Sequence, residues 1–302
     1  MTPLRVVLLG EPGGWHLERL AGVLRHRGHS VDTVRWATLA AGVDDHGDRF
    51  GPPAVAAADA IVVRGMPGVT TASDRLEDVV FRMDVLARLA ARGTAVQNQP
   101  RALEIAIDKY LALATLAAAG LPVPRTRVVQ DAEAAEHAWE ELGRDCVAKP
   151  IFGSRGRGLT RVTTAAMARA TAAAGGVAYL QEFLPHAGWD VRVLVARERT
   201  FAMRRVAAPG EWRTNVSQGG RPEPFEPPEH WVELAVRAAT AVGAEVVGVD
   251  LVPAADGRLA VLEVNAVPGW RGLQSVTEAD IAAELARCLE ELAAFGPLSA
   301  RT

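Results

Sequence analysis

The segment CVAKPIFGSRGRGL, residues 146–159, decides the fold, because it joins a lysine to a glycine-rich loop. A Walker A loop is excluded, since a lysine and a hydroxyl residue must follow its last glycine, and Leu159 follows Gly158 here. A dinucleotide-binding turn is excluded as well, because the glycines occur in the opposite order to GxGxxG. What remains is an apolar strand that ends on Lys149 and leads into a flexible glycine flap.

A strand followed by such a flap suits phosphate binding. In protein kinases a lysine on a strand holds phosphate beneath a glycine-rich hairpin. Glycine N–H groups approach phosphate oxygens closely because no Cβ intervenes. A glycine-rich surface turn beside a solvated lysine would have the same sequence, so the loop alone leaves both interpretations open.

The composition is that of a soluble enzyme. The chain has 302 residues, enough for two or three compact units, of which 23% are charged and 49% hydrophobic. A net charge of -3 argues against a general nucleic-acid binder. Two cysteines form neither a disulfide framework nor a zinc motif, and no apolar run is long enough to cross a bilayer. We expect a cytoplasmic protein with no nucleic-acid or membrane partner.

The first hundred residues alternate apolar runs with helical patterns. Strands are predicted at 4–10, 29–36, 60–65 and 95–98, and helices at 15–29 and 76–93. This alternation is typical of an open parallel α/β sheet, whose ligands bind beyond the carboxyl ends of the strands.

The remaining residues predict a more mixed pattern, with a second unit that begins near Leu103. Helices are expected at 108–120, 132–143, 165–176, 230–243 and 278–295, and strands at 121–129, 145–150, 159–164, 177–185, 245–253 and 258–265, with an antiparallel hairpin at 189–207. Residues 209–228 are expected to form a loop. The apolar C-terminal helix leaves open whether it packs within the chain or across a homodimer.

A second chemical signal lies at residues 248–270, GVDLVPAADGRLAVLEVNAVPGW. Its Asp-Gly turn predicts a hairpin. Glu263 and Asn265 share one face of their strand, and Asp250 on the partner strand can lie opposite them. Two carboxylates and an amide oxygen are hard ligands that suit Mg²⁺. A solvent-facing sheet surface is the alternative, and the apolar flanks favour the metal.

A third signal is the basic segment at 201–220, which brings Arg204, Arg205 and Arg213 near Asn215. Arginines beside a nucleotide and a metal could stabilise charge that moves off a phosphoryl group. A solvated strand edge would also carry alternating arginines, so this spacing is weak evidence.

Taken in order, these segments resemble an ATP-grasp ligase of the RimK-like branch of glutamate-adding ligases. The resemblance rests on DKYLALATLAAAGLPVPRT, VAKPIFGSRGRG, LQEFLPHAGWDVRVLV, AMRR, EWRTN, VVGVDL and VLEVNAVPGW, across the last two-thirds of the chain. It implies an α/β fold that is α+β in its C-terminal part. A Rossmann-like domain at 1–102 would precede a central lobe with the flap at 103–186 and a C-terminal lobe with the metal at 187–302, with ATP held between the two lobes.

The resemblance also implies roles for individual residues. ATP would be bound by Lys109, Lys149, Gly153, Ser154, Gly156, Gly158, Gln181, Glu182, Phe183, Leu184, Asp190, Arg213, Thr214 and Asn215. Mg²⁺ or Mn²⁺ would be bound by Asp250, Glu263 and Asn265, and Arg205 and Arg213 would act in catalysis. Many relatives carry arginine at the position of Gln218, which leaves the acceptor's charge and the donor amino acid open.

The implied reaction is ATP-dependent amide formation through an acyl phosphate, with L-glutamate added to a small-molecule carboxylate. VVRGMP, VVFRMDVL, HAGWD and NAVPGW resemble the branch associated with tetrahydromethanopterin biosynthesis. Arg64, Arg82 and Arg192 are candidates for binding a substrate carboxylate, although surface arginines are equally common in an arginine-rich chain. One alternative is a relative that modifies a protein or carrier-protein C-terminus. The other is a non-catalytic ATP-binding regulatory module, against which the lysines and the metal triad argue.

Overall fold

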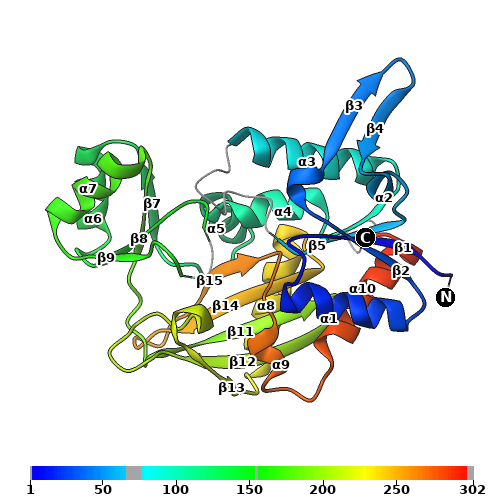
Figure 1. Cartoon of the computed structure of the whole chain (residues 1–302). Helices are drawn as coiled ribbons and strands as arrows, with labels where there is room; N and C mark the ends of the chain where they lie inside the picture. The colour runs from blue at the N-terminus through cyan, green and yellow to red at the C-terminus, as the bar shows by residue number, and fades with distance from the viewer. Residues whose placement is uncertain (1, 66–75, 154–155, 298–302) are drawn as a thin grey trace.

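The computed structural model describes residues 2–65, 76–153 and 156–297, which form three main sheets flanked by helices (Figure 1). The three sheets follow one another along the chain. The mixture of a parallel sheet with two antiparallel sheets confirms the expected α/β class with an α+β C-terminal part. None of the described helices has the length and apolar character needed to cross a membrane.

The first sheet is parallel throughout, as predicted. Its strand order is β2 (Ser30–Val34), β1 (Arg5–Leu9), β5 (Ala60–Val63) and β6 (Ala95–Gln97). Helices α1 (Trp15–His26) and α3 (Leu76–Ala91) accompany these strands. Helix α1 buries Leu17, Leu20, Ala21 and Leu24, the spacing of one helical face.

The sequence patterns missed several short elements here. The hairpin of β3 (Ala40–Asp44) and β4 (Gly47–Gly51) projects from the body of the molecule (Figure 1). Every residue of β3 is exposed, so the strand lacks the apolar alternation that would have revealed it. The short helices η1 (Trp36–Thr38), α2 (Pro53–Ala56) and α4 (Pro100–Ile107) were also not predicted.

The second sheet is antiparallel, with the order β7 (Thr126–Val129), β10 (Ala178–Glu182), β8 (Cys146–Lys149) and β9 (Thr160–Val162). Helices α6 (Ala132–Glu141) and α7 (Ala165–Gly175) pack together and cover its small apolar core. Helix α5 (Lys109–Ala118) precedes this unit, and the Asp108 carboxylate caps it by accepting hydrogen bonds from the N–H groups of Tyr110 and Leu111.

The third sheet is also antiparallel, in the order β13 (Arg221–Pro224), β12 (Arg199–Val206), β11 (Trp189–Ala196), β14 (Val246–Pro253) and β15 (Leu259–Asn265). The two predicted hairpins are therefore present. Helix α8 (Glu229–Val242) contacts β11, β14 and β15, and the short helix α9 (Arg271–Gln274) contacts β12.

The expected loop at 209–228 contains more structure than predicted. It includes the turn η2 (Val216–Gln218) and the edge strand β13, which pairs with β12. Pro222 and Pro224 concealed this strand, because proline cannot donate to a sheet ladder and is tolerated only at an edge.

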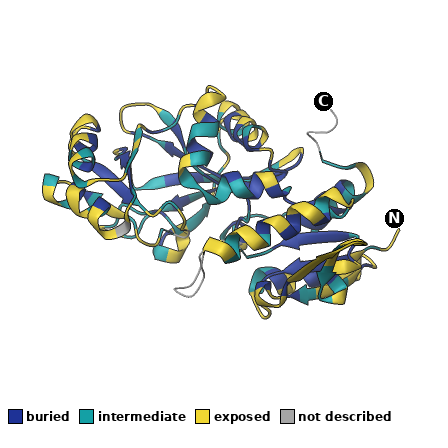
Figure 2. Ribbon diagram, turned by 90° about the horizontal axis from the view of Figure 1, so that it is seen from above, coloured by how far each residue is buried: buried dark blue, intermediate teal, exposed yellow. Residues whose placement is uncertain are grey.

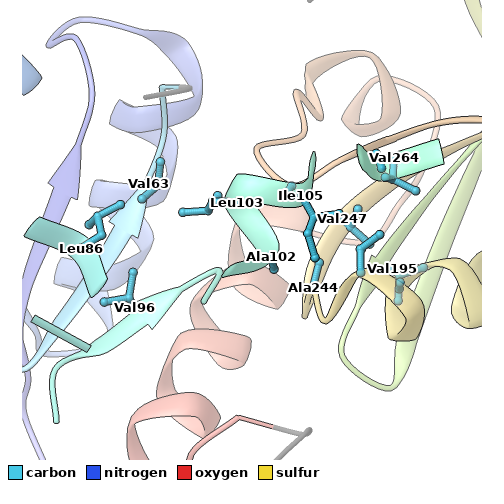
Figure 3. Close-up of a cluster of buried hydrophobic side chains, with 14 of the residues drawn as sticks. Val63, Leu86, Val96, Ala102, Leu103, Ile105, Val195, Ala244, Val247 and Val264 are labelled. Carbon is cyan, nitrogen blue, oxygen red and sulfur yellow. The ribbon is translucent and has the colours of Figure 1, made fainter. Parts of the chain in front are cut away.

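One continuous apolar core joins the first sheet to the third. Figure 3 shows Leu103 of α4 between Val63 and Leu86 on one side and Val247 on the other. Helix α10 (Ile281–Phe295) packs within the chain against α1 and β6, with its apolar face buried. Figure 2 shows the buried strands beneath helices whose outer faces are exposed.

Candidate functional site

A pocket lies between the second and third sheets, and most of the predicted site residues line it. Its lining includes Lys109, Lys149, Gly153, Gly156, Gln181, Glu182, Phe183, Leu184, Asp190, Arg205, Arg213, Thr214, Asn215, Asp250 and Glu263. Gly158, Asn265, Arg64, Arg82 and Arg192 are not part of this lining, and Ser154 lies outside the described residues. The structure therefore brings together residues up to 154 positions apart, from Lys109 to Glu263.

Two lysines mark the phosphate-binding end that the sequence predicts. Lys149 ends β8 and donates a hydrogen bond from Nζ to Gln181 Oε1 at 2.6 Å. Burial lowers the pKa of Lys149 to about 8, against the opposing attraction of Glu263, because few groups replace the water around its ammonium. Lys109 begins α5 and donates from Nζ to the Gly153 carbonyl at 2.6 Å. Both ammonium groups thus lie beneath the glycine flap.

The flap reaches across to the third sheet. Gly156 and Gly158 have positive φ angles of 69° and 72°, a conformation that favours glycine. A Cβ added to Gly156 would lie 2.5 Å from Asn215 Oδ1. The flap therefore lines one side of the pocket, and a side chain at Gly156 would be strained and would force Asn215 to move.

The two predicted carboxylates are direct cross-strand neighbours. Asp250 on β14 is paired with Glu263 on β15, and Asn265 lies opposite Gly248, so the three side chains share the face expected. Burial alone would raise the pKa of Asp250, but Arg192 and Arg205 lower it to about 2, so it is ionised. Asn265 Oδ1 accepts a hydrogen bond from the Val267 N–H at 3.0 Å.

Two carboxylates and an amide fit a magnesium ion whose other ligands would come from phosphate and water. Among the described residues no three His, Cys, Asp or Glu side chains gather as a metal cluster. Asp250 and Glu263 both line the pocket that holds the lysines.

A buried ion-pair network supports Asp250. Arg205 donates to both oxygens of Asp190, at 2.8 and 2.5 Å, and its Nη2 also lies 2.8 Å from Asp250 Oδ2. Thr214 donates from its hydroxyl to Asp190 Oδ2 at 2.6 Å. Asp190 and Arg205 are 1% and 2% exposed, so their side chains contact protein rather than solvent in this structure. Arg213 instead pairs with Glu211 at 2.6 Å.

The other end of the pocket is apolar and aromatic. Phe183 and Trp212 pack edge to face, with ring centroids 5.8 Å apart, and the Arg161 guanidinium lies 3.5 Å from the Phe183 centroid. Burial lowers the pKa of His186, which keeps the imidazole neutral. A flat base would find a stacking surface here. No spacing of residues in the sequence points to Trp212 or Arg161.

The segment predicted to contact the base, residues 181–184, is partly engaged by the protein. The N–H groups of Glu182 and Phe183 donate to the carbonyls of Arg125 and Asp145. The Glu182 carboxylate pairs with Arg125 and Arg258. Glu182 therefore fixes this segment in place.

The three predicted substrate arginines are separated. Arg64, half-buried at the end of β5, donates from Nη2 to the Pro268 carbonyl at 3.0 Å. Arg82 on α3 lies 5.9 Å from the ring of Trp36, and Arg192 pairs with Asp250. Their roles toward a substrate stay predictions.

Contacts from the N-terminal residues to the loop after β15 were missed. Asn98 Nδ2 donates to the carbonyls of Val246 and Ala266, and its Oδ1 accepts from the N–H groups of Glu245 and Val246. His16 Nε2 accepts from the N–H groups of Trp270 and Arg271, at 3.0 and 3.2 Å. No sequence pattern predicts such long-range contacts.

Comparison with known proteins agrees with this geometry. Residues 106–289 match the family described as the RimK-like ATP-grasp domain. The chain is 34% identical to a tetrahydromethanopterin:alpha-L-glutamate ligase of Methanosarcina acetivorans, over 71% of this chain and 74% of that protein. It is 33% identical to a probable alpha-L-glutamate ligase of Xanthomonas euvesicatoria, over 90% and 92% of the two chains.

Solved structures are similar over nearly the whole chain. The ATP-grasp ligase PsnB complexed with minimal precursor has a TM-score of 0.74 and 28% identity, over 96% of this chain and 99% of that one. A further PsnB structure contains a precursor variant, Mg and ADP. The RimK domain protein ATP-grasp from Sphaerobacter thermophilus has a TM-score of 0.72 and 25% identity, over 94% and 99% of the chains.

Proposed function

Because the chain belongs to the RimK-like ATP-grasp family of ATP-dependent ligases, we propose that it joins L-glutamate to a carboxylate of a small-molecule acceptor. The observation that carries the proposal is the shared pocket of Lys109, Lys149, Asp250 and Glu263 beneath the glycine flap. The lysines supply positive charge for ATP phosphates, and the carboxylates supply ligands for Mg²⁺.

The reaction would proceed in two steps. A carboxylate oxygen of the acceptor attacks the γ-phosphorus of ATP, and the bond to ADP breaks, leaving an acyl phosphate. The glutamate amine then attacks the activated carbonyl, loses a proton and expels phosphate, which leaves an amide. A magnesium ion held by Asp250, Glu263 and Asn265 would offset the charge of the phosphoryl group. The flap would exclude water that could hydrolyse the acyl phosphate.

The residues of the pocket have separate roles in this reaction. Lys109 and Lys149 hold the phosphates, and Asp250, Glu263 and Asn265 would hold the metal. Arg205 keeps Asp250 ionised and in place, while Phe183 and Trp212 offer a surface for the adenine. No side chain needs to act as a nucleophile. Both cysteines are buried, which raises the pKa of each thiol to about 12 and keeps them unreactive.

The acceptor is the finer part of the proposal. A pterin of the tetrahydromethanopterin type is supported by 34% identity to ligases of that name. A peptide acceptor is the second candidate, because the similar ligase PsnB is complexed with a precursor peptide. A non-catalytic module is disfavoured, since the lysines and both carboxylates are present in one pocket.

An ADP-release assay across acceptors tests the proposal. Purified protein with ATP, Mg²⁺ and L-glutamate is given a tetrahydropterin carboxylate, a carboxylate-ended peptide or no acceptor. We expect ADP release that requires an acceptor, and a product heavier by one glutamyl residue. Product from the peptide alone would favour the second candidate. Nucleotide binding without turnover on any acceptor would refute the ligase proposal.

A further inference from the structure

Arg192 forms an ion pair with the side chain that is expected to bind the metal. It lies on β11 directly opposite Asp250 on β14. Its Nε lies 2.6 Å from Asp250 Oδ1 and its Nη2 lies 2.7 Å from Oδ2, so both carboxylate oxygens are engaged. The side chains of Arg192 and Asp250 are 15% and 3% exposed. This is a two-pronged, largely desolvated pair.

The two arginines around Asp250 differ in how they are held. Arg205 also donates twice to Asp190, so it keeps a carboxylate partner if Asp250 is withdrawn. Arg192 has Asp250 as its carboxylate partner within the described residues. Arg192 is therefore the arginine that can leave without breaking up the buried network.

The stem of Arg192 lies over the backbone of β14 at Gly248, two residues before Asp250. A Cβ added to Gly248 would lie 3.3 Å from Pro268 Cβ, 3.6 Å from Arg192 Nε and 3.7 Å from its Cδ, so the stem is packed there and only the absence of a side chain lets it pass. The side chain of Arg192 is 15% exposed, whereas that of Arg205 is 2% exposed. Of the two arginines, Arg192 is therefore the one whose guanidinium has access to solvent when it leaves Asp250.

A divalent cation and a guanidinium compete for one carboxylate. With the metal bound, three positive charges would lie within a few ångströms of Asp250: the metal ion, Arg192 and Arg205. Burial strengthens the repulsion among these charges. We propose that Arg192 is a positioning residue that holds Asp250 while the site is empty and that a metal ion displaces it. The inference rests on the proposed function, because it takes Asp250 as a metal ligand.

The exchange has a consequence for the order of binding. Before the metal enters, the positive charge of Arg192 is neutralised by its ion pair with Asp250. After the metal enters, the guanidinium is available to an anionic group of a substrate. Metal binding would thereby create a cation beside the pocket that the empty protein does not offer.

Manganese binding tests this exchange directly. Free Mn²⁺ is measured by electron paramagnetic resonance as protein is titrated, with and without ADP. We expect R192Q to bind Mn²⁺ roughly tenfold more tightly than the unaltered protein without ADP, a typical scale for coupling between two sites. R204Q is the matched control, because Arg204 also pairs with a carboxylate on a neighbouring strand, Glu223, in a more exposed pair that involves one carboxylate oxygen. Its Mn²⁺ affinity should be unchanged.

A second measurement uses the unaltered protein and does not depend on how R192Q folds. Phenylglyoxal modifies accessible arginines, and the modified positions are mapped by mass spectrometry. Modification of Arg192 should increase when Mn²⁺ is added, while Arg205 stays protected.

The outcomes separate the inference from the function on which it rests. Equal or weaker Mn²⁺ binding by folded R192Q, or Arg192 modification that ignores Mn²⁺, would overturn the exchange alone. If the unaltered protein bound no Mn²⁺ even with ADP, the metal site would be wrong and the exchange would fall with it.

Discussion

Asn98 offers the sharpest test of how the N-terminal residues support the site. Asn98 is 3% exposed, and its side chain makes four hydrogen bonds, between 2.6 and 2.9 Å long, to backbone groups at the start of β14 and just after β15. One of them fixes Ala266, the residue directly after Asn265. In N98A, two buried carbonyls and two buried N–H groups would lose their partner.

The expected loss follows from those four groups. A buried polar group left without a partner costs about 1–3 kcal/mol, and water that enters the vacated space recovers part of this. We therefore expect N98A to lower the free energy of unfolding by roughly 3–5 kcal/mol, a large share of a typical domain's stability. N98D should be at least as unstable at neutral pH, because its second oxygen would face the carbonyls of Val246 and Ala266.

Urea unfolding followed by circular dichroism measures both variants. The deficit of N98D should shrink as the pH falls, because the buried carboxyl has a raised pKa in the folded state and its protonated form can donate one bond. Q99A is the control, since Gln99 makes one long bond of 3.4 Å to the Val96 carbonyl, and its cost should stay below about 1 kcal/mol. A loss of less than about 1 kcal/mol in N98A would refute the reasoning.

Three further changes address the site itself. E263Q should abolish ADP release while leaving the unfolding midpoint nearly unchanged, and full activity with Mg²⁺ would disprove the metal assignment. Because Lys149 has a pKa of about 8, ADP binding measured by calorimetry should weaken as the pH rises through that value. The same depressed pKa means that, between about pH 8 and 10, the unfolded chain binds more protons at this lysine than the folded chain does, so Lys149 makes the free energy of unfolding rise with pH there. A K149M variant should lose the pH dependence of ADP binding and this contribution to the pH dependence of stability. G156A should collide with Asn215 and leave the flap open, so ADP release should exceed amide formation, whereas unchanged coupling of the two would show that the flap tolerates a side chain.

Local patterns predicted the site where its chemistry lies on regular strands. The Asp-Gly turn predicts the hairpin of β14 and β15, and the two-residue period of a strand places Glu263 and Asn265 on one face. Lys149 could be placed because an apolar strand ends at it. These inferences need only neighbours in sequence. The register next to the turn pairs Leu251 with Val261 and would set Asp250 opposite Leu262, so it is the β-bulge between Asp250 and Leu251 that sets Asp250 opposite Glu263. No pattern in the sequence predicts that bulge.

The remaining features depend on contacts that no local pattern encodes. Arg192 faces Asp250 because β11 and β14 pair with a particular register across 58 residues, and the sequence of either strand is compatible with other registers. The network of Asp190, Arg205 and Thr214 likewise requires β12 and the following loop to be placed first. Sequence therefore predicted which residues carry charge but not which charges neutralise each other.

The hydrogen bonds from the N-terminal residues to the loop after β15 limit how chimeras of such ligases can be made. Asn98, Arg64 and His16 hold Ala266, Pro268, and Trp270 with Arg271, three successive anchor points just beyond Asn265. A chimera that replaced residues 1–102 with those of another ligase would exchange all three donors and acceptors together. The part of the chain that precedes the matched family domain therefore cannot be exchanged independently to change the acceptor. A graft would have to keep these three side chains.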